Sequence, residues 1–141
     1  MVVRQARDAG EVAQALELRR RVFSDEQGVS AASDQDGRDG EAIHIVALDE
    51  GALRGTCRVL ITHEVAALGR MVVEAGERRR GVGRAVLAGA ERAARDAGAR
   101  RVVLHAQLPA EDFYAQSGYT TSGRRFVEQG IAHIAMEKRL A

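Results

Sequence analysis

Apolar residues recur along the chain with two different spacings, which predict alternating segments of helix and strand. Near the N-terminus, Asp8 lies three residues before Glu11, as in a helix-capping box, and apolar side chains follow at helical spacing to about residue 23. A second helix is predicted at residues 83–97, because its apolar residues form one stripe and Gly98 suits its C-terminal cap.

Shorter apolar or alternating segments predict the strands of a sheet. In the last of them, Ala132, Ile134 and Met136 alternate with polar residues, as in a strand with one buried face. The predicted strands cover residues 1–3, 43–49, 53–62, 67–74, 100–106, 119–126 and 131–140, with a short helix at 109–118. Because several strands precede the central helix, we expect a mixed α/β fold with helices on both sheet faces, rather than a doubly wound parallel sheet.

The overall composition excludes several classes of protein. The 141 residues fit one domain with one core, and 21 basic against 20 acidic side chains argue against a general nucleic-acid-binding protein. No stretch of about 18 apolar residues predicts a membrane span, and the N-terminus has no signal-peptide pattern, so we expect a cytoplasmic protein. Cys57 is the only cysteine, and the four histidines lack metal-binding spacing, so we expect neither a disulfide nor a zinc site.

The turn before the second helix, residues 77–86 (ERRRGVGRAV), combines arginines with glycines. A glycine-rich turn between a strand and a helix exposes backbone N–H groups, which together with the helix dipole attract anions such as phosphate. Gly81 and Gly83 allow close approach to the backbone, and the neighbouring arginines add positive charge. The turn lacks the lysine and hydroxyl of a P-loop and the third glycine of a dinucleotide fingerprint. A phosphate-binding loop is therefore predicted, with an unliganded basic helix start as the alternative.

Residues 24–41 are rich in acidic side chains and glycine, and we expect them to form a loop. An EF-hand is excluded because Arg38 fills its third ligand position. One hypothesis is that Asp34, Asp36 and Asp39 attract a cationic amine by electrostatic steering. The alternative is a solvated, flexible loop.

Two blocks of sequence resemble the GNAT superfamily, the acyl-CoA-dependent N-acyltransferases. Arg78-x-x-Gly81-x-Gly83 resembles its Gln/Arg-x-x-Gly-x-Gly/Ala signature, and residues 107–119 resemble its later segment ending in Phe-Tyr-x-x-x-Gly-Phe. Residues 19–29, 43–48 and 130–136 resemble the ElaA-like branch. The resemblance covers nearly the whole chain and implies one GNAT domain over residues 1–141. Its fold would be a mostly antiparallel mixed sheet of six to seven strands with helices on both faces.

The resemblance also implies an activity and a binding site. An acetyl group would pass from acetyl-CoA to a primary amine of a small molecule or peptide, by direct attack in a ternary complex and without a metal. Backbone groups of residues 71–73 would pair with the pantetheine arm, and N–H groups of residues 79–84 would bind the pyrophosphate. A homodimer is compatible with the resemblance, and a non-catalytic acyl-CoA-binding module is the alternative function. The implied cofactor contacts are Met71, Val72, Val73, Arg78, Arg79, Arg80, Gly81, Val82, Gly83, Arg84, Gln107, Phe113 and Tyr114.

Proton transfer is assigned less completely by the same resemblance. Tyr114 occupies the position of the general acid, and a phenol with a pKa of about 10 can donate to the leaving thiolate at neutral pH. A backbone N–H near Val73 would stabilise the thioester oxygen. Gln107 stands where many members carry asparagine, and Cys57 is expected to be a buried structural residue. The general base is not identified, and its candidates are Glu26, His44, Glu74 and His133. The predicted catalytic residues are Tyr114, His44 and Glu26.

Overall fold

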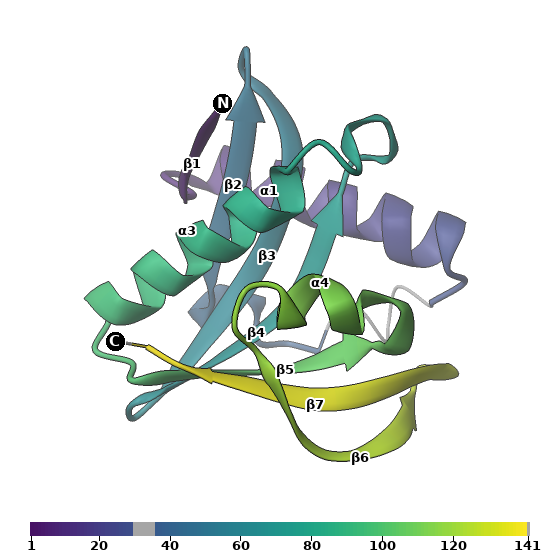
Figure 1. The fold of residues 1–141 in the computed structure, drawn as a ribbon. Coiled ribbons are helices and arrows are strands. Elements are labelled where there is room, and N and C mark those ends of the chain that lie inside the picture. The colour runs from purple at the N-terminus through teal and green to yellow at the C-terminus, as the bar shows by residue number, and fades with distance from the viewer. Residues whose placement is uncertain (30–35, 141) are drawn as a thin grey trace.

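The computed structural model describes residues 1–29 and 36–140, and across these residues seven strands form one sheet (Figure 1). The strand order is β1-β2-β3-β4-β5-β7-β6, and every neighbouring pair is antiparallel except β4 and β5. The mostly antiparallel sheet expected from the sequence is therefore confirmed. The strands are β1 (Val2–Gln5), β2 (Ile43–Asp49), β3 (Ala52–Thr62), β4 (Val65–Val73), β5 (Arg101–Gln107), β6 (Thr120–Glu128) and β7 (Ile131–Arg139).

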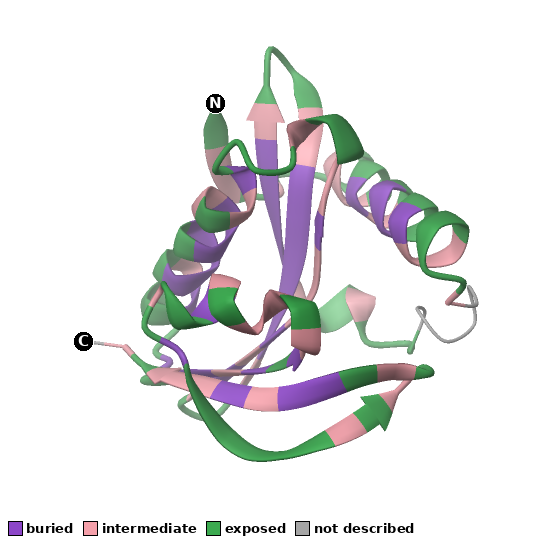
Figure 2. Cartoon of the chain, turned by 45° about the vertical axis from the view of Figure 1, so that its right-hand side comes forward, coloured by how far each residue is buried: buried purple, intermediate pink, exposed green. Residues whose placement is uncertain are grey.

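Helices cover the two faces of the sheet. The helix α1 (Ala9–Arg20) packs on β2 to β4 from one side, and α3 (Val82–Asp96) packs on β1 to β4 from the other (Figure 2). The short helix α4 (Glu111–Ala115) lies against β5. The first helix was expected to end at about residue 23, followed by a loop from residue 24. This was wrong in extent, because a π-helical turn, η1 (Arg21–Glu26), continues α1 into that segment. Three short 3₁₀ turns complete the described helices: η2 (Asp39–Glu41), η3 (Ala75–Glu77) and η4 (Leu108–Ala110).

The main core lies between α3 and the sheet and depends on close approach of helix to strand. Cβ atoms added at Gly55 and Gly89 would lie 2.9 Å from Val82 Cγ1 and 2.6 Å from Val3 Cγ1, distances that real Cβ contacts essentially never show. Glycine at these two positions thus brings α3 into contact with β3 and β1. Cys57 is buried in this core, as expected, and burial raises the pKa of its thiol.

β4 pairs with β5 over only part of its length. The parallel register runs from Val65↔Arg101 to Leu68↔Leu104. Immediately afterwards the register between β3 and β4 shifts, so that two β4 residues face Cys57 alone, and Arg70 takes a left-handed conformation with φ +56°. A bulge of this kind bends the strand that carries it. Past the bulge, β4 turns away from β5 and the sheet opens between them (Figure 1).

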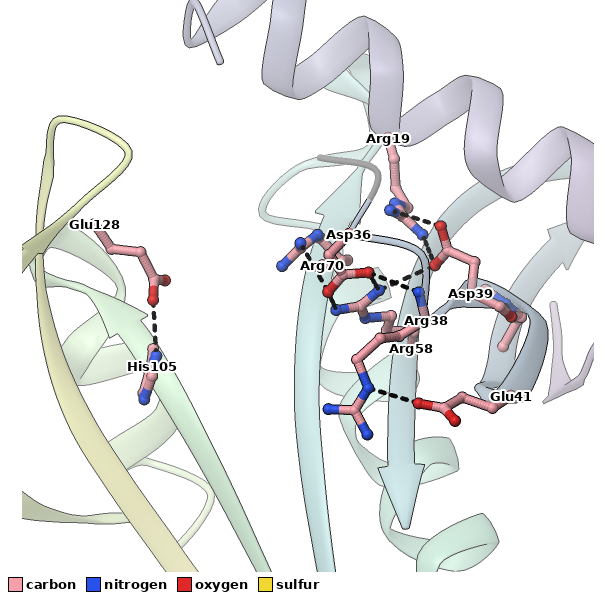
Figure 3. A network of polar contacts seen from close by, with 10 residues as sticks. Arg19, Asp36, Arg38, Asp39, Glu41, Arg58, Arg70, His105 and Glu128 are labelled. Atoms are coloured by element: carbon pink, nitrogen blue, oxygen red, sulfur yellow. Dashed lines mark hydrogen bonds and ion pairs between the residues drawn. The ribbon is translucent and has the colours of Figure 1, made fainter. Parts of the chain in front are cut away.

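A network of arginines and aspartates fixes residues 36–41 against α1 and β3 (Figure 3). The guanidinium of Arg19, almost fully buried on α1, lies 2.7 Å from Asp39 Oδ1. Arg58 on β3 contacts the same oxygen at 3.1 Å and also pairs with Asp36. Arg58 lowers the pKa of Asp36, and Arg19 and Arg58 lower the pKa of Asp39 although burial opposes the shift.

These pairings change the interpretation of the acidic segment. Asp34 lies outside the described residues, and Asp36 and Asp39 each contact guanidinium groups that compensate their charge. Their observed role is to balance buried arginines, which leaves them poorly suited to attract a cationic amine.

We predict that Asp39→Asn lowers the free energy of unfolding at pH 7 by about 3 kcal/mol, because it removes the carboxylate shared by two buried guanidiniums. The folded-state pKa values of both aspartates are lowered, so the network contributes its full stability above the usual aspartate pKa of about 3.9. That contribution is lost as the pH falls from there towards the lower folded-state values. Wild-type stability should therefore drop more steeply below about pH 4 than that of the variant.

Chemical denaturation across pH 3–8 would measure both effects. Glu17→Gln is the matched control, because the Glu17–Arg20 pair is exposed and its loss should leave stability unchanged. Equal stability of Asp39→Asn and wild type at pH 7 would contradict a stabilising role for the network.

Candidate functional site

A cavity of about 1060 Å³ lies where β4 and β5 separate. Its walls come from β4, the loop before α3, β5, α4, the turn between β6 and β7, and the end of η1. Most of the predicted cofactor residues line it: Met71, Val73, Arg78, Arg79, Gly81, Gly83, Arg84, Gln107, Phe113 and Tyr114. The other three, Val72, Arg80 and Val82, do not form part of the wall.

The free edge of β4 presents backbone groups to the cavity. Glu74 N–H donates to the Arg54 carbonyl on β3 at 2.8 Å, so by the alternation of a strand the backbone groups of Val73 point away from β3. The Val73 carbonyl instead accepts a hydrogen bond from Arg78 Nε at 3.1 Å. Val72 packs with Leu18 and Val22 beneath α1, which explains why its side chain is absent from the cavity wall.

The loop between β4 and α3 has the geometry of an anion-binding site. Arg79 and Gly81 both have positive φ, +66° and +82°, and Gly81 caps α3 without any side-chain hydrogen bond. The first backbone hydrogen bond of the helix is donated by Ala85 N–H to the Gly81 carbonyl. The N–H groups of residues 82–84 thus have no partner within the helix and stand at the positive end of its dipole. The donors and the local charge fit a phosphate group, and binding of phosphate by this loop stays a prediction.

Gly83 sets the distance between this loop and α4. A Cβ at Gly83 would lie 3.2 Å from Phe113 Cζ, tighter than nearly all Cβ contacts in proteins. The missing side chain lets the Phe113 ring approach the start of α3, while the same ring meets that of Tyr114 edge to face. Gly83 therefore joins the phosphate-binding loop to the tyrosine that the sequence singled out.

The end of η1 is tied to both sides of the opening. Glu26 forms an ion pair with Arg78 at 2.8 Å, and Gln27 accepts a hydrogen bond from Gln107 Nε2 at 3.0 Å. The Glu26 carboxylate thus compensates an arginine of the phosphate-binding loop and does not line the cavity. This position does not favour Glu26 as a general base, because its carboxylate is engaged by Arg78 and lies outside the cavity wall.

Tyr114 is buried within α4, yet its side chain forms part of the cavity wall. Burial raises its pKa, with a smaller contribution from Cys57, so the phenol stays protonated at neutral pH. Among the described residues, none accepts a hydrogen bond from its hydroxyl. Tyr114 thus presents a protonated phenol beside the cavity, with no acceptor for its O–H among the described residues.

The four candidates for the general base lie in different environments. His44 is buried away from the cavity, and its Nε2 lies 2.9 Å from the carbonyl oxygen of Asp39 behind the arginine network. Glu74 pairs with Arg21 at 3.2 Å and is likewise absent from the wall. Only His133 lines the cavity, because it projects from β7 opposite Gln107.

The structure adds two residues that the sequence did not single out, His105 and Glu128. His105 Nδ1 lies 3.1 Å from Glu128 Oε1 across β5 and β6 (Figure 3). His133 Nε2 lies 3.9 Å from the other carboxylate oxygen. Gln129 and Gly130 both have positive φ, as a tight two-residue hairpin turn requires, and this turn fixes Glu128 at the cavity wall. The Gln-Gly pair is a local sequence signal for a hairpin turn. Nothing in the sequence, however, indicates that Glu128 beside this turn contacts His105 on β5.

The described residues contain neither a metal-binding cluster nor a membrane-spanning helix. No group of three or more histidine, cysteine, aspartate or glutamate side chains is placed to hold a metal ion. Within the same residues, every helix is too short or too polar to cross a lipid bilayer.

Comparison with known proteins gives consistent matches over nearly the whole chain. Residues 5–140 match a family described as "Acetyltransferase (GNAT) domain". YjcF of Bacillus subtilis, described as an uncharacterised N-acetyltransferase, is 34% identical over 94% of this chain and 96% of its own. The crystal structure of Escherichia coli ElaA superimposes with a TM-score of 0.84 at 25% identity, covering 97% of each chain.

An aminoglycoside 6′-N-acetyltransferase complexed with coenzyme A has the same fold. Its TM-score is 0.79 at 17% identity, over 99% of this chain and 97% of that one.

Proposed function

Because the chain belongs to the GNAT acetyltransferase family, we propose that it is an N-acetyltransferase that moves an acetyl group from acetyl-CoA to a primary amine. The acceptor is a small molecule or a peptide, and the two substrates meet in one complex. The observation that carries this proposal is that unpaired N–H donors at the start of α3 and the free Tyr114 hydroxyl belong to the same cavity.

Acetyl-CoA supplies an activated thioester, and the chain's own groups bind and orient it. The N–H groups of residues 82–84, with Arg79 and Arg84 beside them, hold the pyrophosphate. The unpaired edge of β4 offers backbone groups to the amides of the pantetheine arm, as one strand pairs with another. Tyr114 Oη donates a proton to the departing sulfur.

A non-catalytic acyl-CoA-binding module is the second candidate. It is favoured by the observation that Glu26, His44 and Glu74 all lie away from the cavity wall. It differs from the enzyme in one measurable respect, because it would bind the cofactor without releasing free thiol in the presence of an amine.

We predict that the double variant Arg79→Glu, Arg84→Glu loses binding of coenzyme A, because two cationic groups of the loop become carboxylates that repel the pyrophosphate. Calorimetric titration of the wild type should give micromolar affinity, about −8 kcal/mol. The control is Arg92→Glu with Arg124→Glu, which makes the same change of charge at two exposed arginines away from the cavity. Equal affinity of both double variants would place the cofactor elsewhere.

We predict that Tyr114→Phe lowers kcat by about 100-fold while the affinity for coenzyme A stays unchanged, because only the proton donor is removed. Thiol release with a panel of primary amines measures kcat. Tyr119→Phe is the matched control: its hydroxyl donates to buried Glu91 at 2.9 Å outside the cavity, so stability should fall and kcat should not. A wild type that binds the cofactor but releases no thiol with any amine would support the binding module.

A further inference from the structure

Resting on the proposed function, we propose that His133 accepts the proton of the incoming amine and that Glu128, oriented by His105, binds the amine as a cation. The acceptor is accordingly an amine that arrives as an ammonium ion. The step is one proton transfer: an N–H bond of the ammonium breaks, an H–Nε2 bond forms on His133, and the positive charge passes to the imidazole.

The hydrogen bonds of His133 define which of its nitrogens can act as a base. Nδ1 lies 2.7 Å from the backbone carbonyl of Ile131. A carbonyl only accepts hydrogen bonds, so Nδ1 carries the hydrogen and the neutral ring has its lone pair on Nε2. His133 is 6% exposed, and its ring stacks on that of Phe126 with 5.8 Å between the ring centroids, which holds its direction towards the cavity.

Glu128 and His133 face each other as two acceptors without a shared donor. Glu128 Oε2 lies 3.9 Å from His133 Nε2, beyond hydrogen-bond distance, while Oε1 contacts His105 Nδ1 at 3.1 Å. An ammonium that donates to two acceptors at about 2.8 Å each holds them roughly 4.5 Å apart. A small side-chain rotation of the half-exposed Glu128 therefore admits one ammonium between the two groups.

The charges of the cavity favour a cation at this end. Among the described residues of the wall, the only carboxylates are Asp36 and Glu128, and Asp36 is paired with Arg58. Glu128 contacts histidines and no arginine in the described chain. Arg78, Arg79 and Arg84 gather at the phosphate-binding loop, and Arg70 lies 3.6 Å from Asp36. Glu128 thus provides an acidic subsite distinct from the arginine-rich loop.

The first test concerns His133. His133→Ala should lower kcat/KM at least 100-fold, remove the acidic limb of the pH profile of kcat/KM, and recover activity with added imidazole. Affinity for coenzyme A should not change. His63→Gln, at an exposed turn outside the cavity, is the control and should behave as the wild type. Retained kcat/KM with an unaltered pH profile would overturn the proposal, and so would a folded variant that imidazole fails to rescue.

The second test concerns Glu128. Glu128→Gln should raise KM about 10-fold for a cationic amine but leave KM unchanged for hydroxylamine, which is uncharged at the assay pH. An equal change for both nucleophiles would contradict cation binding by Glu128. Glu50→Gln, in the exposed turn between β2 and β3, is the control. A wild type that binds no coenzyme A would defeat the proposed function itself, an outcome distinct from failure of the histidine or glutamate variants.

Discussion

The two β4 residues that face Cys57 alone force β4 away from β5, and the cavity exists because of that divergence. A continuous sheet would have used the backbone groups of residues 69–73 for strand pairing. The bulge leaves that edge of β4 without a strand partner on the β5 side. Cys57, opposite the bulge, remains buried in the main core. Buried backbone groups need partners, so an open strand edge inside a cavity is suited to a ligand with amide groups of its own.

The elements around this opening are held by contacts between segments distant in sequence. The arginine–aspartate network anchors residues 36–41 to α1 and β3, and the end of η1 reaches both sides of the opening through Glu26 and Gln27. Glycines at 55, 83 and 89 bring α3 close to its neighbours. The position of the phosphate-binding loop therefore depends on packing of the whole α3 face, beyond the conformation of its own residues.

Charge is separated along the cavity. Arginines gather at the start of α3, where the helix dipole adds to their field, whereas Glu128 lies at the hairpin between β6 and β7. Tyr114 belongs to the same wall and is kept protonated by burial. This arrangement suits an anionic donor at one end and a cationic acceptor at the other, with a proton donor in the wall that they share.

Local signals in the sequence were sufficient to predict most of the helices and strands. The Asp8 cap is confirmed, and so is the last strand, although Ala132 is exposed and His133 buried, against the expected alternation. The glycines of residues 77–86 form a turn before α3, and its phosphate-binding role stays a prediction. Glu26, His44 and Glu74 had suitable chemistry, but none lies in the cavity wall. Glu26 and Glu74 pair with arginines far along the chain, and His44 contacts the nearby Asp39 carbonyl.

At the bulge the positive φ falls on Arg70, although Gly69 stands beside it. The approach of His105, Glu128 and His133 requires β7 to lie between β5 and β6. The sequence by itself determined which segments are helix, strand and glycine-rich turn, because backbone propensity acts between near neighbours. The tertiary structure decided which side chains share the cavity, because strand order and bulges depend on packing and pairing between distant segments.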